Sequence, residues 1–108
     1  KPICKNQGVS FMLADMYTRL EAARMMVWQA CRCADAGKPD MRLASAAKVF
    51  ASDSGLQVCA DAVQILGGVG YSKEYPVEKR FRDAKLYQIF EGTNQIQRMV
   101  ISGDILKD

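Results

Sequence analysis

The sequence predicts an all-α fold, an up-and-down bundle of four helices that forms one domain over residues 1–108. Apolar residues recur every three or four positions over most of the chain, whereas no apolar–polar alternation typical of strands persists beyond four positions. Only 3 Pro and 8 Gly occur in the whole length, which favours long helices over many short strands. A chain of this size buries enough surface for one core.

The first two predicted helices are long. One covers residues 8–36, with apolar positions at the spacing of an amphipathic helix, and Gly37 and Pro39 end it. The other covers residues 40–66, with Asp40 as a suitable N-cap. Its many alanines and serines allow neighbouring backbones to approach closely.

Two shorter helices are predicted after the glycine-rich residues 67–70, which end the second helix. Pro76 suits the first turn of a helix over residues 77–86, because its missing N–H needs no partner there. Thr93 is the predicted N-cap of the final helix, whose last apolar position is Leu106.

Charge and hydropathy exclude several classes of function. Lys and Arg total 15 against 12 Asp and Glu, and a net charge of +3 is too small and too evenly spread to indicate nucleic-acid binding. No run of about 18 apolar residues indicates a membrane span. The chain begins at Lys1 without an initiator Met, signal peptide or transit segment, so we expect it to be part of a longer protein.

The cysteine pattern does not predict a metal site. Cys31 and Cys33 are the only close pair, and their spacing is not that of a zinc knuckle. We therefore expect four free thiols, at Cys4, Cys31, Cys33 and Cys59, in a reducing compartment. The chain has no histidine, so acid–base chemistry here depends on carboxylates or lysine.

Two stretches have competing structural and functional interpretations. Residues 64–70, with sequence QILGGVG, taken alone predict a glycine helix terminator; the alternative is a loop whose bare backbone lets a ligand approach the Gln64 amide. In the charged residues 71–83, the structural interpretation is an exposed helix face with pairs such as Glu78–Arg82. We favour it over the alternative, in which Arg82 and Asp83 hold the following loop.

A third stretch places a carboxylate, Glu91, between Phe90 and Gly92, immediately before the helix capped by Thr93. Desolvation against Phe90 and an apolar ligand strengthens a carboxylate as a base for proton abstraction. Thr93, Asn94 and the first amides of the helix suit a polar or anionic group. The alternative is an exposed loop glutamate followed by a capping threonine.

Four motifs in this order give the stretches a common interpretation. They are QILGGVGY at 64–71, EYPVEK at 74–79, RDAK at 82–85 and EGTNQIQR at 91–98, and QGVSFMLADM at 7–16 adds to them. Together they closely resemble the C-terminal third of the acyl-CoA dehydrogenases, over essentially the whole chain. The resemblance implies that the N-terminal helical domain and the middle β-domain of that family lie outside this chain.

The resemblance implies FAD-dependent α,β-dehydrogenation of an acyl-CoA thioester. Glu91 matches the catalytic base of medium- and short-chain members, and its presence argues against the long-chain and isovaleryl branches. Glu91, through its backbone N–H, and Gly92 match substrate-binding positions. Phe90 departs from the tyrosine of many members, which leaves the acyl chain-length preference open.

The resemblance also implies positions that bind FAD. They are Gln64, Ile65, Leu66, Gly67, Gly68, Thr93 and Gln95. The segment 64–68 matches one that reaches FAD from a neighbouring subunit, whereas Thr93 and Gln95 match residues that bind FAD in their own subunit.

The implied partners are acyl-CoA, other subunits of a homotetramer and an electron-transfer flavoprotein that accepts the electrons. The implied location is the mitochondrial matrix, or the cytoplasm if the source is bacterial. We expect this chain alone not to turn over acyl-CoA. Two alternatives stay open: a non-catalytic helical module used for assembly, and an acyl-CoA oxidase.

Overall fold

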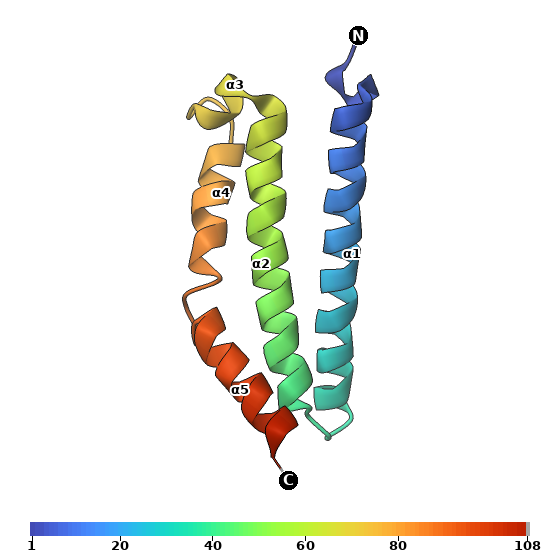
Figure 1. Ribbon diagram of the computed structural model, residues 1–108, viewed down its shortest axis with the longest axis vertical. Coiled ribbons are helices and arrows are strands. Elements are labelled where there is room, and N and C mark those ends of the chain that lie inside the picture. The colour runs from blue at the N-terminus through green and yellow to red at the C-terminus, as the bar shows by residue number, and fades with distance from the viewer. Residues whose placement is uncertain (108) are drawn as a thin grey trace.

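The computed structural model describes residues 1–107, which form helices joined by short loops. After the short 3₁₀ turn η1 (Ile3–Lys5), the long helices α1 (Gln7–Asp35) and α2 (Met41–Leu66) form an antiparallel pair (Figure 1). Helices α4 (Val77–Leu86) and α5 (Asn94–Leu106) follow each other along the other side of α2 (Figure 1). The predicted all-α fold is confirmed.

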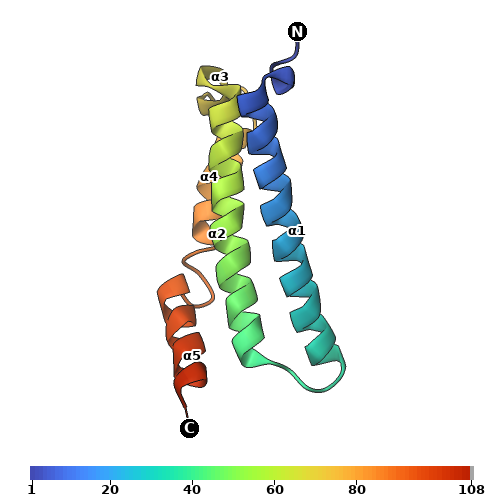
Figure 2. The same ribbon diagram turned by 45° about the vertical axis from the view of Figure 1, so that its right-hand side comes forward.

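Helix α2 lies in the middle of the molecule and contacts α1, α3, α4 and α5. Within the described residues, α1 contacts only α2 and η1, so α2 separates it from the α4–α5 row (Figure 2). The resulting body is elongated, with extents of 56 × 25 × 24 Å. Its radius of gyration of 16.7 Å exceeds the roughly 13 Å of a compact chain of this length.

Both predicted N-caps are confirmed by hydrogen bonds. The Asp40 carboxylate accepts the Leu43 N–H at 3.0 Å, and the Thr93 hydroxyl accepts the Ile96 N–H at 3.2 Å. These bonds satisfy N–H groups that the first turn of a helix leaves without a backbone partner. Gly37, with φ of 76°, follows α1 as predicted.

The glycine-rich segment ends α2 and then forms one more helical turn. Gly67 has φ of 67°, and its N–H donates to the carbonyls of Val63 and Gln64, which confirms the predicted terminator. The turn that follows, α3 (Gly68–Tyr71), was not predicted. It lies so close to α2 that a Cβ atom on Gly70 would lie 2.7 Å from the Leu66 Cβ and 2.8 Å from the Val63 carbonyl oxygen.

The described residues bury few apolar side chains, and none larger than alanine. Ala23 and Ala47 are the buried apolar residues, whereas large ones such as Phe11 and Trp28 are 61% and 53% exposed. The expectation that this chain encloses a core of its own is therefore wrong. The reason is geometric, because α1 and the α4–α5 row lie on opposite sides of a single helix and cannot cover one another. No helix within residues 1–107 is both long and apolar enough to cross a membrane.

We expect Gly70→Ala to lower the free energy of unfolding by about 1–3 kcal/mol, the typical cost of overpacking a tight contact. The added methyl group would meet α2 backbone, which cannot move aside as a side chain can. Gly68→Ala is the matched control, since a Cβ atom there meets nothing within 4 Å. Urea unfolding followed by circular dichroism measures both, and equal effects of the two substitutions would contradict the packing argument.

The exposed apolar faces lead us to expect that the chain self-associates. Many large apolar side chains of both long helices are exposed, among them Phe11, Leu20, Trp28 and Met41, and such faces are typical of surfaces that other protein covers. Sedimentation equilibrium over a range of concentrations measures the association. A strictly monomeric species at high micromolar concentration would contradict the expectation.

Candidate active site

The loop between α4 and α5 carries Glu91. The Asn94 N–H donates to the Gln88 carbonyl at 3.0 Å, which closes the loop on itself. At its start, the rings of Tyr87 and Phe90 meet edge to face at a centroid distance of 4.9 Å. The loop therefore has a fixed shape and presents Glu91 at the surface.

Glu91 adopts a backbone conformation that side chains rarely take. Its φ of 54° makes it the one non-glycine residue with positive φ within the described part of the chain, and Gly92 follows with φ of 84°. A left-handed conformation costs a non-glycine residue about 1–2 kcal/mol. Such residues persist where the surroundings enforce them, and they are concentrated at functional sites.

Two side chains hold the carbonyl groups of this strained pair. The Lys48 ammonium of α2 donates to the Gly92 carbonyl oxygen at 2.9 Å and to the Asn94 side-chain oxygen at 2.6 Å. The Gln97 amide of α5 donates to the Glu91 carbonyl oxygen at 3.1 Å. The loop is therefore attached to both neighbouring helices.

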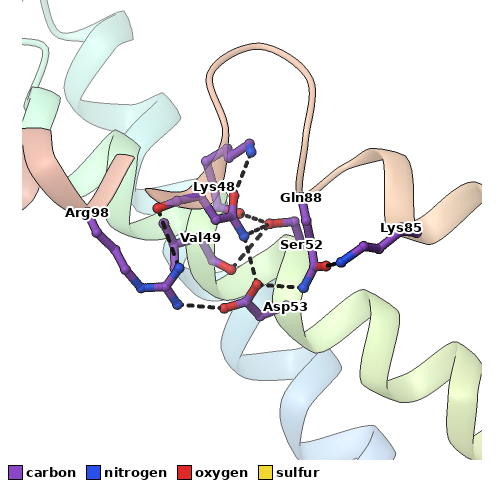
Figure 3. A network of polar contacts seen from close by, with 8 residues as sticks. Lys48, Val49, Ser52, Asp53, Lys85, Gln88 and Arg98 are labelled. Carbon is purple, nitrogen blue, oxygen red and sulfur yellow. Dashed lines mark hydrogen bonds and ion pairs between the residues drawn. The ribbon is translucent and has the colours of Figure 1, made fainter. Parts of the chain in front are cut away.

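A polar cluster on α2 supports the loop from beneath (Figure 3). Asn94 is only 3% exposed, and its amide nitrogen donates to the Ser52 hydroxyl at 2.9 Å and to the Asp53 carboxylate at 2.7 Å. The Asp53 carboxylate also accepts a hydrogen bond from the Gln88 amide and forms an ion pair with Arg98, each at 2.9 Å. We call Lys48, Ser52, Asp53, Gln88, Asn94 and Arg98 the Asn94 network.

Hydrogen bonding lowers the pKa of Asp53 below its ordinary value of 3.8. Partial burial alone would raise the pKa, because it disfavours the charged form. The donors Gln88, Arg98 and Asn94, together with the positive charge of Arg98, outweigh that effect. Asp53 is thus an anion held in place by three donors.

An apolar groove of about 650 Å³ borders Glu91 on one side. Val27, Ala51, Gly55 and Phe90 are among the residues that line it, so much of its wall consists of small side chains. Cys59 also lines the groove, and burial raises the pKa of its thiol although the charge of Arg80 opposes this. All four cysteines are free, as predicted.

A smaller polar hollow of about 350 Å³ lies on another side of the loop. Thr93 and Gln95, both predicted to bind FAD, line it together with Lys85, Arg98 and Gln88. The Asp53 carboxylate also lines the hollow, and Arg98 and the Gln88 amide donate to it. Lys85, Thr93 and Gln95 remain as donors that suit the polar and anionic parts of a dinucleotide such as FAD. The residues present therefore fit that group.

The structure gathers some of the predicted site residues and separates others. Glu91, Gly92, Thr93 and Gln95 lie together at the α4–α5 loop. The segment 64–68 lies at the far end of α2, 16 positions beyond Lys48, which corresponds to roughly 24 Å along a helix. The two groups of predicted FAD residues therefore do not meet within one chain.

No motif in the sequence predicted a role in the site for Lys48, Ser52, Asp53, Gln88 or Arg98. The available signal was a helix of small residues in which Lys48 and Ser52, four positions apart, share a face. By contrast, the charged stretch 71–83 behaves as predicted. Arg82 pairs with Glu78 at 2.7 Å on the exposed surface of α4 rather than holding the loop.

Fold and site together define a helical domain that presents a carboxylate on a strained, tightly held loop. Residues 1–106 match the family model of the acyl-CoA dehydrogenase C-terminal domain. The chain belongs to the acyl-CoA dehydrogenase family, whose members are oxidoreductases.

Curated relatives agree with this assignment. The chain is 51% identical over its full length to cyclohexane-1-carbonyl-CoA dehydrogenase of Geobacter metallireducens, of which it spans 28%. It is 55% identical over 106 residues, 98% of the chain, to an acyl-CoA dehydrogenase of Bacillus subtilis, of which it again spans 28%. It therefore covers a little over a quarter of the length of these bacterial proteins.

Solved structures agree as well. Butyryl-CoA dehydrogenase of Megasphaera elsdenii superposes with a TM-score of 0.96 at 51% identity, over 99% of this chain and 28% of that one. The structure reported as the electron transferring flavoprotein of Acidaminococcus fermentans contains a chain with a TM-score of 0.95 at 50% identity, over 98% of this chain and 28% of that one. The FAD complex of PigA superposes with a TM-score of 0.92 at 31% identity, over 97% of this chain and 27% of that one. The family is flavin-dependent in general.

We expect the Asp53 carboxylate to make the stability of the chain sensitive to acid. Its pKa is lowered in the folded state, so its contribution is present above the ordinary value of 3.8 and is lost as the pH falls through the lower folded-state value. Asp53→Asn should therefore flatten the fall in unfolding free energy between about pH 5 and pH 2. Urea unfolding at a series of pH values measures this pH dependence of the unfolding free energy.

Asp15→Asn is the matched control, because the Asp15 carboxylate is exposed and forms no ion pair within residues 1–107. It should leave the pH dependence as it is in the parent chain. An Asp53→Asn variant with the full acid dependence would show that Asp53 is not a source of it.

Proposed function

We propose that the protein carrying this chain is an FAD-dependent acyl-CoA dehydrogenase and that Glu91 is its catalytic base. The reaction forms a double bond between Cα and Cβ of an acyl-CoA thioester. Because the chain spans 28% of the length of its relatives, the activity belongs to the whole protein. We propose that the chain alone does not turn over acyl-CoA.

The observation that carries this proposal is the conformation of Glu91. A carboxylate on a strained loop, held through the carbonyl groups of Glu91 and Gly92, has the fixed placement that proton abstraction requires. The apolar groove at its side lowers the local polarity once ligand or protein covers it, which strengthens the carboxylate as a base. In this role Glu91 takes the proton from Cα.

Backbone N–H groups of the same loop suit the thioester carbonyl. Within residues 1–107, the N–H groups of Glu91, Gly92 and Thr93 donate no hydrogen bond to the protein. We propose that the Glu91 N–H donates to the thioester oxygen and so stabilises the negative charge that develops there as Cα loses its proton. Gly92 lies beside it without a side chain to obstruct the thioester.

Bound FAD would supply the acceptor for the hydride that leaves Cβ. We propose that Thr93 and Gln95 hold it through the polar hollow beside the loop. The segment 64–68 would reach the FAD of a neighbouring subunit, since it lies far from the hollow in its own chain. The open space around Gly68 supports this role, because packing within the chain does not require a glycine there.

The wider assignments are also part of the proposal. We propose a homotetramer, supported by the exposed apolar faces, and an electron-transfer flavoprotein as the electron acceptor, supported by the similarity to a chain in such a structure. Of the two predicted locations we favour the bacterial cytoplasm, because the relatives named above are bacterial.

The exposed apolar faces also suit the alternative of a non-catalytic assembly module. The visible absorption of the purified full-length protein separates the two, since an assembly module binds no flavin. Peroxide formation in air during acyl-CoA turnover would indicate the oxidase instead of the dehydrogenase.

In the full-length enzyme, we expect Glu91→Gln to lower the rate of flavin reduction by at least about 10²–10⁴-fold, the typical contribution of a positioned general base. That factor corresponds to roughly 3–5 kcal/mol of lost transition-state stabilisation. Binding of acyl-CoA and FAD should persist, because glutamine keeps the side-chain size and the backbone N–H. Stopped-flow mixing with acyl-CoA measures the rate.

Glu74→Gln is the control, as Glu74 is exposed in the loop between α3 and α4 and has no place in the site. Its rate should remain within about twofold of the parent enzyme, as expected of a surface change away from the chemistry. Reduction of the flavin at the parent rate in Glu91→Gln would place the base elsewhere and remove the link to the medium- and short-chain branch.

A further inference from the structure

Successive carbonyl groups on the Glu91 loop are each held by a side chain from a different helix. Gln97 of α5 donates to the Glu91 carbonyl oxygen at 3.1 Å, and Lys48 of α2 donates to the Gly92 carbonyl oxygen at 2.9 Å. We call Lys48 and Gln97 the carbonyl clamp. Lys48 and Gly92 are 44 positions apart in the sequence, whereas Gln97 and Glu91 are 6 positions apart.

The clamp fixes the two peptide groups that follow the Glu91 Cα. A peptide group is planar, so holding its carbonyl oxygen also sets the direction of its N–H and the adjoining backbone dihedral angles. A residue with φ of 54° would otherwise relax toward the more stable negative values. The clamp therefore opposes the relaxation that would turn the Glu91 side chain away from its present direction.

Lys48 is itself held in place. Its ammonium also donates to the Asn94 side-chain oxygen at 2.6 Å, and the buried Asn94 donates in turn to Ser52 and Asp53. Within residues 1–107 Lys48 pairs with no carboxylate, so its charge acts on these two neutral oxygens. A hydrogen bond from a charged donor is roughly twice as strong as one between neutral groups.

We propose that Lys48 and Gln97 are positioning residues for Glu91, which act by holding the backbone of the loop in the conformation that proton abstraction needs. This inference rests on the proposed function. It assigns a task to two side chains that bond to backbone carbonyl groups and, within residues 1–107, form no hydrogen bond or ion pair with the Glu91 carboxylate.

The test uses Lys48→Met and Gln97→Met in the full-length, FAD-loaded enzyme. Methionine keeps an unbranched side chain of similar length but removes the donor. We expect each substitution to slow flavin reduction at saturating acyl-CoA by about 10–100-fold, because a displacement of ~1 Å in a reacting group can cost about 10²-fold. Lys48→Arg, which keeps a charged donor, should retain more of the rate than Lys48→Met.

Lys79→Met and Gln29→Met are the matched controls. Lys79 pairs with Asp83 on the exposed side of α4, and Gln29 is exposed on α1, so neither contacts the loop. Both should reduce flavin at the parent rate. Gln97 is half-buried and forms one side-chain hydrogen bond in the described chain, so Gln97→Met carries the test if Lys48→Met fails to fold.

A positioning role is separated from a general structural one by repeating the substitutions in a Glu91→Gln background. If the clamp acts through the carboxylate, removing a clamp residue from Glu91→Gln should lower the rate of flavin reduction by less than about twofold further. Amide hydrogen exchange supplies a readout other than activity. Exchange of the Asn94 N–H, which donates to the Gln88 carbonyl and closes the loop, should quicken in the clamp variants and stay unchanged in the controls.

The outcomes are distinct. Three results would each overturn the positioning role: unchanged exchange of the Asn94 N–H, an unchanged rate of flavin reduction, or the same fold-loss in rate with and without the Glu91 carboxylate. A parent rate in Glu91→Gln alone would instead overturn the proposed function, while the exchange measurement would still report whether the clamp holds the loop.

Discussion

The packing of every other long helix against α2 is the constraint on which this structure depends. Because α1 does not contact the α4–α5 row, no interaction between them can hold the loop that carries Glu91. The side chains that hold the Glu91 and Gly92 carbonyl groups come from α2 and from α5, the helix that follows the loop. Small residues along α2 make this possible, since Ser45, Ala47, Ser52 and Ser54 are buried and let the flanking helices come close.

The polar residues of α2 have a second task at the loop. Asn94 enters the interface with α2, and its side chain is fully bonded to Lys48, Ser52 and Asp53. Within the described residues no buried side-chain polar atom lacks a partner. A satisfied buried network is rigid and specifies one arrangement of its parts. This rigidity offsets the cost of the left-handed Glu91 and leaves the N–H groups of the loop available to a ligand.

The elongated shape has a consequence for how the site is completed. The glycine-rich end of α2 and the α4–α5 loop both carry positions that resemble FAD-binding residues, yet they lie roughly 24 Å apart along the helix. The long helices keep large apolar side chains exposed. Both features are expected of a domain that functions against other protein surfaces, and they agree with the small fraction of its relatives' length that the chain represents.

The sequence by itself determined what depends on near neighbours. Helix periodicity, the caps Asp40 and Thr93, the terminator Gly67 and the motif around Glu91 all act within a few residues, so they could be predicted. Only the tertiary structure showed that α2 separates α1 from the α4–α5 row. It alone showed that Lys48 bonds to the Gly92 carbonyl, 44 positions away, and that Asn94 bonds to Ser52, 42 positions away. Contacts at such separations depend on which helix faces meet. Periodicity identifies the apolar face of each helix but does not specify its partner.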